Sequence, residues 1–185
     1  MRKVIFAINM TLDGNCDHTK GNPDGEVHDY FTELLSGAGI LAYGSKTYEL
    51  MVPFWPDMAR NRSGPTKELN DFARVFDALD KVVFSRSLKH VDDAHTRIVS
   101  SDPWDEIARL KQEEGKPISI GGVDIPSQLM ERGLVDEYHF VVHPIIAGEG
   151  RRLMGGINLV ESLHLKLVET RVFKSGCVAL KYVKA

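Results

Sequence analysis

The order of the apolar segments constrains the fold more than any other feature of this sequence. Up to Gly133, short apolar runs alternate with amphipathic segments, and only short apolar runs follow it. Runs such as Val4–Ile8 are continuously apolar, as in strands covered on both faces. Segment 27–38 places apolar residues three and four positions apart, which is helical spacing. This alternation predicts a three-layer α/β/α fold with a mixed, mostly parallel sheet and antiparallel C-terminal strands.

The boundaries of the elements follow from capping and turn residues. Ser45, Thr66 and Asp102 are expected to cap helices, and Gly133 to end one. Segment 54–65 is expected to be a loop in which residues 60–64 are mobile, and the polar segment 9–25 a functional loop. Strands are expected at 4–8, 40–43, 81–85, 96–99, 116–120, 138–143, 163–173 and 177–183, and helices at 27–38, 45–52, 66–76, 103–114 and 124–132.

Composition excludes several functional classes. The 185 residues suit a single domain, 1–185, and the net charge of −3 argues against a nucleic-acid or polybasic membrane binder. No apolar run approaches the roughly 20 residues that span a bilayer, and no signal peptide is evident. Two cysteines and seven histidines show no metal-ligand spacing. We therefore expect a cytoplasmic protein without a metal site.

Three junctions that directly follow predicted strands carry residues that suit anionic ligands. In open α/β sheets, ligands bind at the carboxyl ends of parallel strands. Paired glycines let a backbone approach a ligand closely, hydroxyls and a lysine can hold phosphate, and an arginine suits the 2′-phosphate of NADPH. The candidate cofactor-binding residues are Gly44, Ser45, Lys46, Thr47, Ser85, Arg86, Ser87, Ile120, Gly121 and Gly122. Together they predict a dinucleotide lying across the strand ends.

Each junction also has a reading that needs no ligand. The glycines can form a tight turn, Ser45 can be an ordinary helix cap, and Arg86 can be a surface residue in a turn. The glycine spacing of a Walker A loop is absent. Asp13 follows the first strand and is the candidate catalytic, substrate-facing residue, although Asp13 and Gly14 also suit a turn made for its backbone geometry.

The junctions and the segments that follow them form a recognisable set. They are residues 10–14, 44–48, 83–87, 118–122 and 130–137, continued by 142–146 and 148–150. On these segments the chain resembles the dihydrofolate reductase-like superfamily. Within it, the resemblance is to the reductase domain at the C-terminal end of the bifunctional riboflavin-biosynthesis deaminase–reductase.

The resemblance implies NADPH as cofactor and hydride transfer to a small heterocyclic or ribosyl substrate, as in 5-amino-6-(5-phosphoribosylamino)uracil reduction. It implies that Ser45 and Thr47 meet phosphate, that 85–87 meet the adenosine end, and that Gly121 and Gly122 meet the pyrophosphate across a cis peptide bond. A homodimer paired through a sheet edge or the tail strands is expected on the same ground.

Two alternatives stay open beside this reading. One is a dihydrofolate reductase, although the helical position of its pterin-binding carboxylate falls near Val27. The other is a non-catalytic nucleotide- or metabolite-binding module on the same fold, because a fold does not fix a function.

Overall fold

The computed structural model describes residues 1–185 except 154 and 156. Among these residues, eight strands form one sheet in the order β4-β3-β2-β5-β1-β6-β8-β7. The strands are β1 (Val4–Thr11), β2 (Ile40–Gly44), β3 (Asp80–Phe84), β4 (Thr96–Val99), β5 (Ile118–Ile120), β6 (Glu137–His143), β7 (Leu165–Val172) and β8 (Val178–Lys184). The helices are α1 (Gly25–Ser36), α2 (Ser45–Met51), α3 (Trp55–Asn61), α4 (Lys67–Ala78), α5 (Pro103–Gln112) and α6 (Asp124–Glu131).

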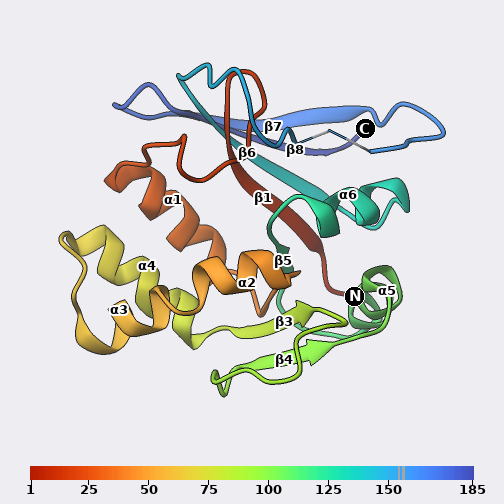
Figure 1. Ribbon diagram of the computed structural model, residues 1–185. Helices are drawn as coiled ribbons and strands as arrows, with labels where there is room; N and C mark the ends of the chain where they lie inside the picture. Colours follow the sequence, from red (N-terminus) through yellow and green to blue (C-terminus); the bar gives the residue numbers. More distant parts are fainter. Residues whose placement is uncertain (154, 156) are drawn as a thin grey trace.

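The sheet is mixed and mostly parallel, so the predicted fold is confirmed. β6 is still parallel to β1 because α6 provides its crossover connection, and only β7 and β8 run antiparallel to their neighbours. The hairpin between these two strands turns at Gly176, whose φ is +83°. Figure 1 shows this hairpin extending beyond the helical layers.

The helices cover the two faces of the sheet, and each face has its own hydrophobic core. On one face, α5 and α6 pack their buried side chains, including Ile107 and Leu129, against β1, β2 and β5. On the other face, α1, α2 and α4 contribute residues such as Phe72 and Phe76, which pack against β2 and β3. The three-layer arrangement follows from this division (Figure 1). None of the described helices is long and apolar enough to cross a membrane.

The predicted loop at 54–65 is wrong over most of its length, because residues 55–61 form α3. Pro56 lies in the first turn of this helix, where a missing backbone N–H costs nothing. The Trp55 ring packs edge-to-face on Phe72 of α4, with centroids 4.5 Å apart. Arg62, with a φ of +48°, ends the helix in the left-handed conformation. Tertiary packing on α4 therefore stabilises a helix of only seven residues.

Thr66 and Asp102 occupy the predicted N-cap positions of α4 and α5, but only the Thr66 side chain makes a capping bond, accepting a hydrogen bond from the Leu69 N–H. Gly44 is the N-cap of α2 and Ser45 is its first helical residue, so the capping position carries no side chain. The Asp102 carboxylate makes no capping bond and instead accepts a hydrogen bond from Arg86 Nη2 at 2.7 Å.

Candidate functional site

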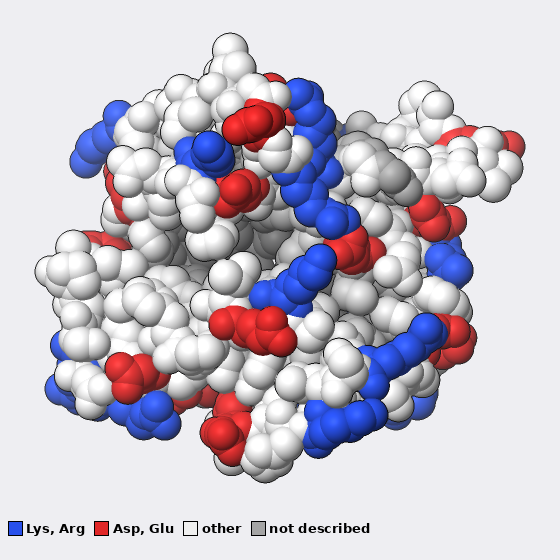
Figure 2. All heavy atoms as spheres, viewed as in Figure 1, with Lys and Arg blue, Asp and Glu red and all other residues white. Residues whose placement is uncertain are grey.

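A cavity of about 780 Å³ opens where β1, β2 and β5 end. Its walls come from β1 and the loop after it, from α1, α2 and the start of α3, and from the β5–α6 turn. Figure 2 shows the hollow on the molecular surface, with basic side chains along one edge and a few acidic side chains among the uncharged surface around the rest of it. The cavity therefore lies where ligands bind in open α/β sheets, at the carboxyl ends of parallel strands.

One end of the cavity is formed by the β5–α6 turn, which we call the turn end. A Cβ atom built on Gly121 would meet no atom within 4 Å, so its backbone faces open space. Gly122 has a φ of +81°, and a Cβ there would lie 2.7 Å from Thr47 Oγ1. The Gly121–Gly122 peptide is trans, so the cis expectation is wrong: the left-handed φ of Gly122 shapes the turn instead.

The cations that line the described cavity are Lys46 and Arg151. Lys46 lies on the first turn of α2, beside Thr47. Arg151 pairs with Asp124, the first residue of α6, and both side chains are about half exposed. An exposed ion pair of this kind is weak, so Arg151 can exchange Asp124 for an anionic ligand at little cost.

The other predicted cofactor-binding residues lie next to the cavity but do not line it. Gly44 pairs with Phe84 in the parallel β2–β3 register, so residues 44–45 and 85–87 lie side by side at the carboxyl ends of these two strands. Arg86 is 80% exposed and bound to Asp102. Thus the structure brings Lys46, Thr47 and 120–122 together around the cavity and places the remaining candidates outside its lining.

The Asp13 carboxylate is fixed by hydrogen bonds within the protein. Its carboxylate accepts hydrogen bonds from Thr11 Oγ1 at 2.5 Å and from the backbone N–H groups of Gly148 at 2.9 Å and Ala147 at 3.1 Å. These bonds, with that from Thr11 first, lower the pKa of Asp13 to about 2. Asp13 is absent from the lining of the main cavity. Its carboxylate therefore joins the loop after β1 to the loop after β6.

The opposite end of the cavity lies between α1 and the α2–α3 segment, and we call it the apolar lobe. It is formed by Phe31, Leu34, Leu50, Met51, Phe54 and Trp55. Val27, fully buried, occupies the region of α1 where the resemblance to dihydrofolate reductases implies a carboxylate. The carboxylate of neighbouring Asp24 instead caps α1, accepting a hydrogen bond from the Val27 N–H. No acidic side chain of α1 enters the described lining, which argues against pterin binding.

Sequence reasoning missed a polar chain of three residues beside this lobe. His143 is 1% exposed; its Nε2 lies 3.0 Å from Asn9 Oδ1 and its Nδ1 3.4 Å from Cys177 Sγ. Burial lowers the pKa of His143, so its ring is neutral near pH 7. His143 is the last residue of β6, and Asn9 lies two residues before the end of β1. A polar residue near the end of each predicted strand was the sequence signal that could have indicated this cluster.

The family model for the RibD C-terminal domain matches residues 2–179. The chain belongs to this family. The family is reductase-like, which supports an oxidoreductase, and the resemblance stated from the sequence is confirmed. Two relatives from Bacillus subtilis (strain 168) are the uncharacterized proteins YyaP and YwjB. YyaP is 30% identical, covering 98% of this chain and 94% of its own, and YwjB is 28% identical, covering 100% and 99%.

Solved structures agree on the fold. A putative riboflavin biosynthesis protein from Shewanella sp. PV-4 superposes with a TM-score of 0.73 at 21% identity, covering 100% of this chain and 99% of that one. The Thermotoga maritima diaminohydroxyphosphoribosylaminopyrimidine deaminase/5-amino-6-(5-phosphoribosylamino)uracil reductase gives 0.67 at 17%, covering 100% of this chain and 57% of that one. At these identities the likeness shows the fold alone.

Proposed function

We propose that this protein is an NADPH-dependent reductase that transfers a hydride to a small heterocyclic substrate, as the uracil reductase of riboflavin biosynthesis does. The observation that carries the proposal is one cavity with two unlike ends. Open space lies against the Gly121 backbone at the turn end, and the apolar lobe continues from it. A reductase needs such a pair of adjoining compartments, one for the cofactor and one for the hydride acceptor.

The residues of the turn end fit a dinucleotide. Gly121 lets a pyrophosphate lie against the backbone, and Lys46, Thr47 and Arg151 can meet its oxygens. In this proposal Gly44, Ser45 and 85–87 extend the site along the sheet edge, with Arg86 reaching the 2′-phosphate. A nicotinamide cofactor bound there would supply a hydride, that is two electrons with one proton, and would be left oxidised; the reduced acceptor would take its second proton from solvent after the transfer.

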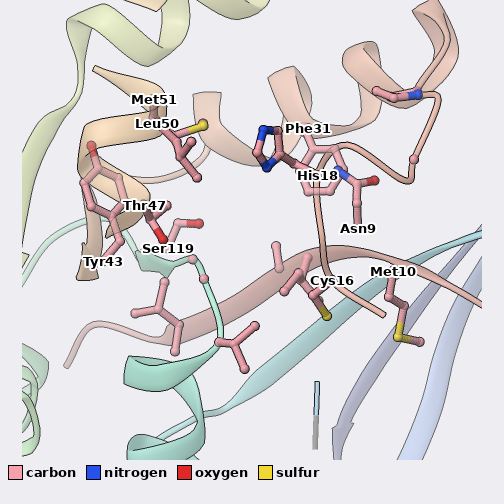
Figure 3. A pocket seen from close by; sticks show the side chains of 18 of the residues that line it. Asn9, Met10, Cys16, His18, Phe31, Tyr43, Thr47, Leu50, Met51 and Ser119 are labelled. Atoms are coloured by element: carbon pink, nitrogen blue, oxygen red, sulfur yellow. The ribbon is translucent and has the colours of Figure 1, made fainter. Parts of the chain in front are cut away.

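The chain itself holds the two reactants together and keeps water away from them. Phe31 and Met51 face the cavity from α1 and α2, on either side of its middle (Figure 3). Apolar side chains there exclude solvent and align the acceptor, and fixed orientation of two reactants is worth several kcal/mol of a barrier.

The test is direct. Purified protein is titrated with NADPH and NADH, and NADPH oxidation is then followed with a panel of heterocyclic acceptors by stopped-flow absorbance. Tighter binding of NADPH and oxidation that depends on an acceptor support the proposal. NADPH binding without turnover of any acceptor favours the non-catalytic binding module, and no binding of either cofactor refutes the proposal.

A homodimer is part of the proposal. β7 is an edge strand of the sheet, and it exposes Leu167, Val168 and Val172, of which Val172 is 74% exposed. An exposed apolar edge favours pairing with another chain. Size-exclusion chromatography with light scattering tests the homodimer. The mass of a monomer at micromolar concentration would contradict it.

A further inference from the structure

We propose that the apolar lobe binds a neutral, planar carbonyl compound without a phosphate group, and that the Asn9 amide donates a hydrogen bond to its carbonyl oxygen. The inference rests on the proposed hydride-transfer function and narrows its substrate class. Three features of the lobe carry it: the shape and polarity of its wall, the position of the cations, and the free donor on Asn9.

The wall of the lobe is built for a flat apolar ring. Phe54 and Trp55 pack edge-to-face at 4.9 Å, and Trp55 is further fixed by Phe72. Phe31 and Leu34 line the facing side, on α1. Leu50 and Phe54 remain 55% and 54% exposed, so a ligand placed here would remove a large apolar area from water. Flat apolar or aromatic molecules gain the most from such a slot.

The lobe offers no counter-charge for a phosphate. Of the Lys and Arg side chains that line the described cavity, Arg151 pairs with Asp124 at the turn end and Lys46 lies beside Thr47 on the first turn of α2. The six residues that define the lobe are uncharged, and His28, which packs edge-to-face on Trp55, is a titratable cavity-lining side chain beside them. A phosphate among them would lose its hydration without an ionic partner, which is strongly unfavourable. The charge distribution therefore favours a neutral substrate and leaves the phosphates of the cofactor to the turn end.

The hydrogen-bond chain behind the lobe fixes the Asn9 amide. His143 Nδ1 lies 3.4 Å from Cys177 Sγ, and Nε2 lies 3.0 Å from Asn9 Oδ1. We assign the proton of the neutral ring to Nε2, so that Nε2 donates to Asn9 Oδ1 and Nδ1 accepts from the thiol. The opposite tautomer would leave the imidazole N–H donating to sulfur, a weaker acceptor. The Asn9 amide oxygen therefore already accepts a hydrogen bond, and both protons of the Asn9 amide nitrogen remain available to a ligand.

Within this chain of hydrogen bonds, the Asn9 amide nitrogen is the donor that lacks an acceptor among the described residues. No described residue accepts a hydrogen bond from Asn9 Nδ2, and Asn9 lines the cavity. Figure 3 shows this nitrogen turned toward Phe31 and His18, with the oxygen turned away. A polar group held in place and left without a partner discriminates strongly between ligands that can pair with it and ligands that cannot. A carbonyl oxygen is the simplest acceptor for an amide donor.

Trp55 allows the proposal to be tested by binding alone, without turnover. The chain has two tryptophans, so a Trp104→Phe background isolates the Trp55 fluorescence. Three probes are titrated: coumarin, which is neutral, planar and carbonyl-bearing; 2H-chromene, which lacks the carbonyl; and 4-methylumbelliferyl phosphate. Each is measured with the parent, with Asn9→Asp and with Asn9→Val. Exposed Asn61 on α3 supplies the matched control, Asn61→Asp.

We expect coumarin to bind the parent about tenfold more tightly than 2H-chromene, as one hydrogen bond to a fixed donor gives. Both Asn9 variants should abolish this preference, and Asn61→Asp should keep it. In Asn9→Asp a carboxylate beside His143 keeps a partner, so a folded variant is expected. Circular dichroism checks this for both variants.

Three results with the parent would overturn the proposal: equal affinities for coumarin and 2H-chromene, tighter binding of the phosphate probe, or no binding of coumarin at millimolar concentration. A preference that persists in folded Asn9 variants would also overturn it. Failure of the proposed function looks different. In that case NADPH neither binds nor is oxidised, while the Trp55 signal still shows the Asn9-dependent preference.

Discussion

The turn end and the apolar lobe of the cavity are specified in different ways. The turn end depends on backbone: Gly121 leaves open space, and Gly122 takes a φ of +81° against Thr47. The lobe depends on side chains such as Phe31 and Trp55, which come from helices on one face of the sheet. A backbone shape tolerates few substitutions, whereas a side-chain wall can change its chemistry without changing the fold. The same fold can therefore keep one cofactor site while its substrate changes.

The largest expected effect separates the two glycines. Gly121→Ala places a methyl group in open space, so we expect normal stability but a loss of NADPH affinity of about a hundredfold, or about 2.7 kcal/mol. Gly122→Ala should also lose stability, because a left-handed φ costs an alanine roughly 1–2 kcal/mol and its Cβ meets Thr47. Thermal unfolding and NADPH titration on the same preparations give both quantities.

The two glycine variants serve as controls for each other, because they separate an effect on folding from an effect on NADPH binding. If both are only turn residues, Gly121→Ala will fold and bind NADPH as the parent does. That outcome would refute the proposal that the cofactor binds at the turn end. A stable Gly122→Ala with full affinity would contradict the geometry of the turn as well.

A second prediction gives the lobe the charge it lacks. Leu50 is 55% exposed, so in Leu50→Lys the ammonium group can reach water and the fold should survive. We expect affinity for 4-methylumbelliferyl phosphate to rise about tenfold and affinity for coumarin to fall a few-fold. Val160→Lys, a change of the same kind at a fully exposed residue outside the cavity lining, should alter neither. Unchanged phosphate affinity in Leu50→Lys would mean that the lobe is not the substrate subsite.

Sequence patterns predicted the parts of this molecule that depend on neighbouring residues. Continuous apolar runs identified the parallel strands, and strand-to-helix glycines identified the turn end. α3 was missed because its seven residues depend on Trp55 packing against Phe72, a contact between segments. Periodicity within so short a segment carries no such information.

The polar chain behind the lobe was missed for the same reason. Asn9 and His143 are 134 positions apart, and Cys177 lies a further 34 from His143. The parallel register of β1 with β6, which pairs Thr11 with His143, brings Asn9 to His143. The antiparallel register of β6 with β8, which pairs Val142 with Val178, brings Cys177 beside the same histidine. Likewise Arg86 and Asp102 pair across the β3–β4 edge, so an arginine predicted for phosphate and an aspartate predicted for a cap hold each other.

A third prediction concerns Asp13, which belongs to neither end. Its folded-state pKa of about 2 lies below its usual value, so the carboxylate stabilises the fold above about pH 4 and loses this effect as the pH falls toward 2. Asp13→Asn should therefore be less stable than the parent at neutral pH, and the difference should shrink between pH 4 and pH 2. NADPH affinity should be unchanged. Urea unfolding across this range measures the difference in stability. Lost turnover in a folded Asp13→Asn would support the catalytic role predicted from the sequence.

The smallest expected effect tests how far the turn end extends along the sheet edge. Arg86→Ala should weaken NADPH binding about three- to fivefold and leave NADH binding unchanged, because only NADPH carries the 2′-phosphate. A well-formed contact to a charged group is worth roughly 1.5–3 kcal/mol, but Arg86 is 80% exposed and already bound to Asp102, so solvent screening and competition reduce its effect. Asp102→Asn supplies the matched control: it releases Arg86 and should raise NADPH affinity slightly. Salt should weaken NADPH binding more in the parent than in Arg86→Ala. Equal affinities of the parent for NADPH and NADH would confine the cofactor contacts to the residues that line the cavity, with Arg86 left as a surface ion pair.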